Sequence, residues 1–202
     1  AHLVATCQAN LATGLMSRNR FEADQQDRDR AVELWEAALT SDYLDADERA
    51  GVHANIAQAV SSSAQTVEQL DAALEHGRCS LSLSTEDSDD LAQRHFSLAN
   101  ALTSRAERAP APGLFEEAVH HTRLGLELLG QEHPDYPGYC VNLATALRSL
   151  ARETGNVAPL DEAETLVREA ILPRVGPGDT DHVLALTMGG AILSELAYWR
   201  DD

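Results

Sequence analysis

Two pairs of acidic and histidine residues have a spacing that could support catalysis or metal binding. Glu116 with His120, and Glu117 with His121, lie four residues apart within a helical pattern. This spacing brings a carboxylate and an imidazole together on one helix face, where they could share a proton or hold a metal ion. It is far more common as weak support of an exposed helix. We therefore expect no catalytic residue, no metal ligand and no cofactor.

Acidic clusters and cysteines are the other chemical candidates. Residues 42–48 and 86–90 are rich in carboxylates, but neither has the glycine and terminal glutamate of a calcium-binding EF-hand, so both are expected to be solvated loops. Cys7, Cys79 and Cys140 are widely separated and form no CxxC pair, which predicts reduced thiols in a cytoplasmic protein. No phosphate-binding loop or nucleophile elbow is present, so the chain is not expected to be an enzyme.

The net charge of the chain limits the classes of partner that it is expected to bind. Its 202 residues include 33 acidic and 15 basic ones, giving a formal net charge of −18. Binding to phosphate backbones or anionic lipid depends on clustered cations, so neither nucleic acid nor a membrane surface is expected as a partner. No run of about 18 apolar residues exists that could span a bilayer.

Polar residues recur at the spacing i, i+3, i+7 in four segments, which places each set on one helix face. The four sets are Asn10, Thr13 and Ser17; Asn55, Gln58 and Ser62; Ser97, Asn100 and Ser104; and Asn142, Thr145 and Ser149. A carboxamide offers a donor and an acceptor together and can match a peptide backbone. Phe96 and Val141 could add apolar pockets, and Arg148 one cation. Two interpretations of this polar face remain open. It could bind a peptide, or its amides could bond to a neighbouring repeat or face water.

The elements that carry this face belong to a repeat. Small residues recur at Ala12, Ala57, Ala99 and Ala144, with Gly190 in a degenerate fifth copy, and a second series comprises Ala31, Ala73, Ala118 and Ala163. Each unit contains two amphipathic helical patterns, and a small residue at a fixed place marks close contact between helices. An aspartate before each first helix (Asp47, Asp89, Asp135 and Asp181) is expected to cap it.

These hairpins cannot bury their apolar faces alone, so they are expected to stack on one another. We predict one all-α domain over residues 1–202, an α-solenoid of four helix-turn-helix repeats and a final unpaired helix. The repeats are expected at about 1–44, 45–86, 87–132 and 133–178, with a partial unit at 179–202. Because solenoids need capping elements, the chain is expected to be part of a longer protein.

The pattern resembles the tetratricopeptide repeat. Leu143, Ala144 and Leu147 fit its first helix, and Ala163, Val167 and Ala170 fit its second. Leu11, Ala12 and Leu15, followed by Ala31, Trp35 and Ala38, fit as well. Gly77, Ser80, Thr122 and Gly125 depart from the pattern, and their hairpins are expected to pack less tightly. The repeat period exceeds the usual length of about 34 residues. In this respect the units are similar to kinesin-light-chain repeats and to bacterial arrays fused to CHAT-type peptidases or signalling NTPases.

The resemblance implies a right-handed superhelix whose first helices line a concave groove, with asparagines that grip a bound peptide. The expected binding residues are Asn10, Thr13, Asn55, Gln58, Phe96, Asn100, Asn142, Thr145 and Arg148. The expected function is a protein or peptide interaction scaffold within a larger bacterial regulatory protein. The alternatives are self-association through open solenoid ends, or an intramolecular array that regulates a fused peptidase or NTPase. Replacing Asn55 and Asn142 by alanine is expected to weaken binding without unfolding the array.

Overall fold

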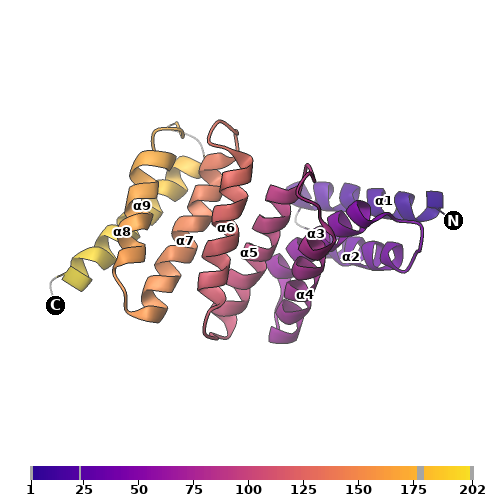
Figure 1. Ribbon diagram of the computed structural model, residues 1–202, viewed down its shortest axis with the longest axis horizontal. Coiled ribbons are helices and arrows are strands. Elements are labelled where there is room, and N and C mark those ends of the chain that lie inside the picture. Colours follow the sequence, from indigo (N-terminus) through magenta and orange to yellow (C-terminus); the bar gives the residue numbers. More distant parts are fainter. Residues whose placement is uncertain (1, 23, 177–179, 201–202) are drawn as a thin grey trace. The chain divides into compact units, whose positions relative to one another are not determined.

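The structure, a computed structural model, describes residues 2–22, 24–176 and 180–200, which form helices joined by turns and loops. The helices are α1 (His2–Glu22), α2 (Gln25–Leu39), α3 (Ala46–Ser63), α4 (Val67–Leu83), α5 (Leu91–Arg108), α6 (Leu114–Leu129), α7 (Tyr136–Thr154), α8 (Ala158–Thr165) and α9 (Thr180–Arg200) (Figure 1). Helix α8 continues directly into a π-helical segment, η1 (Leu166–Ile171). The prediction of an all-α fold is confirmed for these residues.

The chain divides into two compact units, Ala1–Pro110 and Ala111–Asp202. In the first unit, α1 packs on α2, α3 on α4, and α4 on α5, while α3 also contacts α1, α2 and α5. The first helices of successive predicted repeats (α1, α3 and α5) therefore contact one another, and each also contacts a second helix. The division between the units separates α5 from α6, the two helices of the third predicted repeat.

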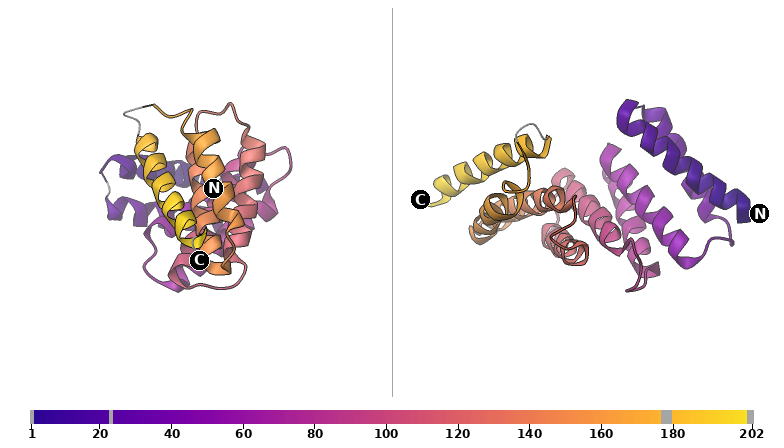
Figure 2. Two further views of the ribbon diagram at one scale, coloured as in Figure 1. Left: turned by 90° about the vertical axis from the view of Figure 1, so that its left-hand side faces the viewer. Right: turned by 90° about the horizontal axis from the view of Figure 1, so that it is seen from above.

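The second unit is built around α7. This helix contacts α6 on one side and α8, η1 and α9 on others, and α9 also packs on α8 and η1. Figure 2 gives two further views of these helices, in which α9 runs beside α8. The unit again consists of helices that contact their nearest neighbours along the chain.

Both alanine series are buried, as their spacing predicts. The eight alanines are between 0% and 3% exposed, so the helix axes approach closely at each of these positions. Gly190, which aligns with the first series, differs because it is exposed on α9. A methyl group added there would meet no atom within 4 Å. Among the described residues, nothing covers this part of α9.

The expectation of looser packing at Gly77 and Ser80 is wrong. A Cβ atom on Gly77 would lie 3.0 Å from Cδ1 and 3.3 Å from Cα of Leu98, so the glycine permits close contact between α4 and α5. The buried Ser80 hydroxyl donates to the Ala50 carbonyl on α3 at 2.8 Å. At Gly77 and Ser80, the departures from the repeat pattern therefore coincide with close contact between α4 and its neighbours.

The expected helix caps need correction as well. Asp45, rather than Asp47, caps α3 in a capping box with Glu48. Asp135 occupies the cap position of α7 without a side-chain hydrogen bond, and Asp90, not Asp89, precedes α5, also without one. The side chain of Asp181 lies outside the described residues.

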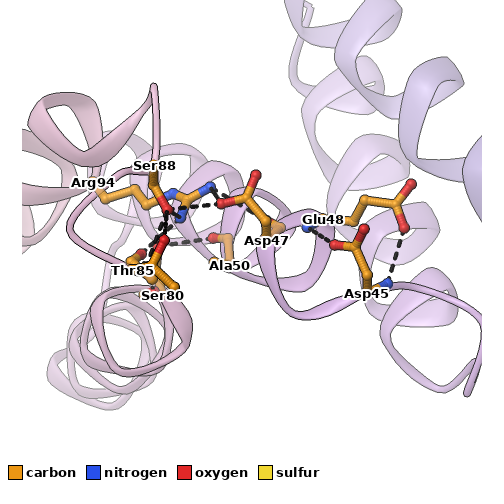
Figure 3. Close-up of polar contacts among 9 residues, drawn as sticks. Asp45, Asp47, Glu48, Ala50, Ser80, Thr85, Ser88 and Arg94 are labelled. Carbon is orange, nitrogen blue, oxygen red and sulfur yellow. Dashed lines mark hydrogen bonds and ion pairs between the residues drawn. The ribbon is translucent and has the colours of Figure 1, made fainter.

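Asp47 lies in the first turn of α3, where it pairs with a buried arginine. Arg94 on α5 is 1% exposed and donates to the Asp47 carboxylate at 2.8 Å (Figure 3). It also donates to Ser84 Oγ at 2.7 Å. Ser88 donates to the same carboxylate at 3.0 Å. The Arg94 bond holds the pKa of Asp47 below its usual range, with Ser88 adding to the effect. This network ties α3, the end of α4 and α5 together.

Candidate polar pocket between the first and third helices

A pocket of about 350 Å³ lies where α1, α2 and α3 meet. Three of the predicted binding residues line it: Thr13 from α1, and Asn55 and Gln58 from α3. The remaining lining residues are Met16, Ser17, Arg28, Trp35, Ala59 and Ser62. The polar faces of the first two repeats therefore share one pocket, which lies entirely within the first unit.

The hydroxyl groups of the pocket donate to their own helices. Thr13 Oγ1 donates to the Ala9 carbonyl, Ser17 Oγ to Thr13 and Ser62 Oγ to Ala59, each at 3.0 Å. Because each hydroxyl uses its single hydrogen inside the helix, it offers only lone pairs to the pocket. The hydroxyls act as acceptors for any molecule that enters.

The two carboxamides are the groups that remain available. Gln58 is exposed and Asn55 half-buried, and no side chain or backbone group among the described residues hydrogen-bonds to either carboxamide. Each can donate two hydrogen bonds and accept through its oxygen. They lie three residues apart on α3, so both face the same pocket. Bonding of these amides to a neighbouring repeat does not occur at this site within the described part of the chain, which leaves peptide binding and a water-facing polar stripe.

Helix α2 contributes two residues to the pocket, Trp35 and Arg28, which the sequence pattern did not indicate. Trp35 is 2% exposed, and its indole N–H is buried with no hydrogen-bond partner among the described residues. Arg28 is the one charged side chain of the nine described residues that line the pocket. Both lie on the second helix of the repeat, whose apolar spacing predicts packing only.

An ion pair between Arg18 and Asp27 joins α1 to α2 and lowers the pKa of Asp27 through its hydrogen bond.

The other expected binding residues of the first unit lie outside this pocket. Asn10 is exposed on α1, three residues before Thr13, and Asn100 is half-buried on α5. Phe96 is 1% exposed, so it belongs to the core and does not line the pocket. Its apolar position in α5 is satisfied by packing.

Three expected binding residues lie on α7 in the second unit and partly contact α9. Thr145 donates to the Val141 carbonyl at 2.9 Å and contacts the sulfur of Met188 at 3.8 Å. Arg148 forms an ion pair with Glu195 at 3.1 Å. Asn142 is half-buried beside them on the helix. At Thr145 and Arg148 the predicted face is therefore used for contact between helices.

The described residues contain no group of three or more histidine, cysteine, aspartate or glutamate side chains that could hold a metal ion. The rings of His120 and His121 lie 5.4 Å apart on α6, with His120 exposed. Cys7 and Cys79 are exposed free thiols and Cys140 is a buried one. Burial is the main factor that raises the pKa of Cys140. None of these arrangements resembles a catalytic constellation.

A histidine pair joins α3 to α4. The Nδ1 atoms of His53 and His76 lie 2.9 Å apart, so one ring donates and the other accepts. Burial, with smaller contributions from His76 and Arg49, lowers the pKa of His53 to about 4. Burial also lowers the pKa of His76, opposed by Glu36 and Glu75. Both imidazoles are therefore neutral near pH 7.

Comparison of the sequence with protein-family models gives no match, and comparison with curated proteins gives none either. A functional assignment therefore rests on the geometry of the pocket described above. Among the described helices, none is both long enough and apolar enough to cross a bilayer.

Proposed function

We propose that the chain is a protein-interaction module of tetratricopeptide type that binds an extended segment of a partner at the pocket between α1 and α3. The observation that carries this proposal is the pair of carboxamides, Asn55 and Gln58, which face the pocket without partners among the described residues. An extended segment presents unpaired backbone N–H and C=O groups, which carboxamides match without regard to side chains.

The rest of the pocket suits such a segment. The hydroxyl oxygens of Thr13, Ser17 and Ser62 accept hydrogen bonds, while Trp35 and Met16 supply apolar surface. Contact between α1 and α3, and between α3 and α5, follows the arrangement that tetratricopeptide arrays use to form a groove from successive first helices. The absence of clustered histidine, cysteine and carboxylate groups in the described residues gives no support to an enzymatic role.

The test begins with a library of random linear peptides displayed on phage, selected on the purified chain. A selected peptide is synthesised with a fluorescent label, and its affinity is measured by anisotropy. We expect Asn55→Ala together with Gln58→Ala to weaken binding by about tenfold or more, because two hydrogen bonds of about 1 kcal/mol each are lost. Both carboxamides face the pocket without a hydrogen bond to the rest of the described chain, so the helical circular dichroism and unfolding temperature should not change.

Gln65→Ala is the matched control, since Gln65 is an exposed carboxamide outside the pocket. This variant should bind like the wild type. Equal affinities for the double variant and the wild type would contradict the proposal, as would a library that yields no binder. Asn142→Ala is a separate arm: a loss of affinity there would extend the binding surface into the second unit.

A further inference from the structure

His53 on α3 and His76 on α4 face each other across the contact between these two helices. Their Nδ1 atoms lie 2.9 Å apart and their ring centroids 5.0 Å, so the rings meet edge to edge at these nitrogens. Both side chains are half-buried and keep some contact with solvent. An imidazole nitrogen with a free lone pair can bind a metal ion as well as a proton. Two of them at one point form a candidate metal site.

Buried neighbours fix the position of both histidines. The residues three before and four after each histidine are 0% exposed: Ala50 and Ala57 on α3, and Ala73 and Ser80 on α4. The Ser80 hydroxyl donates to the Ala50 carbonyl at 2.8 Å, which joins the two helices one turn away from the imidazoles. Both imidazoles therefore stand on well-packed backbone, as the ligands of a preformed metal site do.

Packing of the hairpin does not explain two imidazoles at these places. The same two repeat positions carry other residue pairs in the remaining predicted repeats: Gln8 with Leu34, His95 with His121, and Cys140 with Leu166. A glutamine or a cysteine in the first helix and a leucine in the second therefore serve the helical pattern equally well. The pair in α3 and α4 calls for an explanation in terms of its chemistry.

The separation of the two nitrogens matches that of adjacent ligands on a copper(II) ion. An imidazole nitrogen lies about 2.0–2.1 Å from a bound divalent ion such as zinc. With bonds of this length, two nitrogens 2.9 Å apart subtend an angle of about 90° at the ion. This is the angle of square-planar copper(II) sites, whereas a tetrahedral zinc site would need a separation of about 3.3 Å. Copper(II) also binds nitrogen ligands more strongly than the other divalent ions of its series.

The charges around the pair favour a cation. Burial lowers the pKa of both imidazoles, so at pH 7 an ion need not displace a proton from either ring. The carboxylates of Glu36 and Glu75 act on His76, and the guanidinium of Arg49 acts on His53. Arg49 donates to two backbone carbonyls near the end of α2, each at 3.2 Å, which engage its positive charge. Two negative charges and one positive charge leave a local net charge of −1.

We propose that His53 and His76 bind a copper(II) ion through their two Nδ1 atoms. The ring that donates the present hydrogen bond then carries its proton on Nε2, so both imidazoles stay neutral. The described residues contain no cluster of three metal-binding side chains, so water would occupy the remaining coordination positions. The ion would join α3 to α4 within the first unit. Neither histidine lines the polar pocket, so this site is independent of peptide binding.

The test uses copper(II) chloride as the probe and glycine as a competing chelator. All proteins carry His2→Gln, because an imidazole next to a terminal amine is itself a copper ligand. Further substitution of His53→Gln or His76→Gln should each weaken copper binding roughly tenfold or more, since one of two protein ligands is lost. His133→Gln is the matched control, because His133 is an exposed histidine of α6–α7 connection, and it should leave the affinity unchanged.

Two spectroscopic measurements require no substitution at the site itself. Pulsed electron paramagnetic resonance should count two imidazoles bound to the copper ion. In nuclear magnetic resonance, copper well below one equivalent should broaden the ring signals of His53 and His76 before those of other histidines. Equal affinities with and without the two histidines would overturn the proposal. Fewer than two bound imidazoles, or earlier broadening at other histidines, would overturn it too, even if the variants fail to fold.

Discussion

Arg94 on α5 and Asp47 on α3 form an ion pair of 2.8 Å in which the arginine is buried and the carboxylate is largely exposed. Removing Asp47 and removing Arg94 therefore have different consequences. Without Asp47, a guanidinium that is 1% exposed keeps its charge and loses its anionic partner. Without Arg94, the carboxylate returns to water.

We expect Asp47→Ala to lower the free energy of unfolding by about 1–3 kcal/mol, because the buried guanidinium keeps its bonds to Ser84 and to the backbone carbonyl of residue 47 but loses its anionic partner. Arg94→Met should cost less, since it removes the buried charge and keeps much of the apolar volume. Urea unfolding followed by circular dichroism measures both. A larger loss for Arg94→Met than for Asp47→Ala would contradict this account of the pair.

The pH dependence of stability should reflect the histidine pair. The pKa of His53 falls from an ordinary value of 6.5 to about 4 in the folded chain, and that of His76 is also lowered. The unfolded chain therefore binds protons more readily, so stability is complete above pH 6.5 and falls as the pH drops from 6.5 toward 4. Arg49 strengthens this effect at His53, whereas Glu36 and Glu75 weaken it at His76.

Urea unfolding at pH 7 and pH 5 measures this loss, and His53→Gln should make it smaller. Titration of the imidazole signals by nuclear magnetic resonance gives the individual midpoints. Midpoints of both rings near 6.5 would contradict the buried, neutral pair. Asp47, whose pKa is lowered by Arg94, adds a separate loss of stability only below about pH 4.

Gly77 should resist replacement by alanine. The added methyl group would press on Leu98, so Gly77→Ala is expected to lower the free energy of unfolding by about 1–3 kcal/mol, despite its better helix propensity. Gly51→Ala, where the methyl group meets open space in α3, should instead raise it by up to about 1 kcal/mol. Leu98→Ala should cost less in the Gly77→Ala background than in the wild type. Additive effects of the two changes would exclude the predicted contact.

Trp35 should report on occupation of the polar pocket. It lines the pocket, and the chain has one other tryptophan, Trp199. In a Trp199→Phe background, a peptide that binds the pocket should shift the emission of Trp35 or change its intensity, because the surroundings of its ring change. The titration should give the same affinity as anisotropy with the labelled peptide. Unchanged emission at saturation would place the peptide elsewhere.

The helical elements were predictable because apolar spacing of 3.6 residues and paired small residues are properties of the sequence itself. Asn55, Gln58 and Thr13 were grouped for the same reason. Arg28 and Trp35 were not, because a packing pattern on α2 does not reveal that its side chains reach a pocket formed by two other helices.

Other differences between prediction and structure depend on contacts with residues that are distant in the sequence. Asp45 and Asp47 are both of a residue type suited to capping; in the structure Asp45 caps α3, and Asp47 pairs instead with Arg94, which is 47 residues further along the chain. Phe96 has the periodicity of either a groove or a core position, and packing within the first unit places it in the core. Gly77 departs from the repeat pattern because its neighbour Leu98 lies unusually close.

Within each unit, the described helices contact only their next or next-but-one neighbours along the chain. Such short sequence separations mean that little loop entropy is lost before favourable contacts form, which is the topology of rapidly folding proteins. During synthesis, each new pair of helices can dock on those already made, without waiting for distant parts of the polypeptide to leave the ribosome.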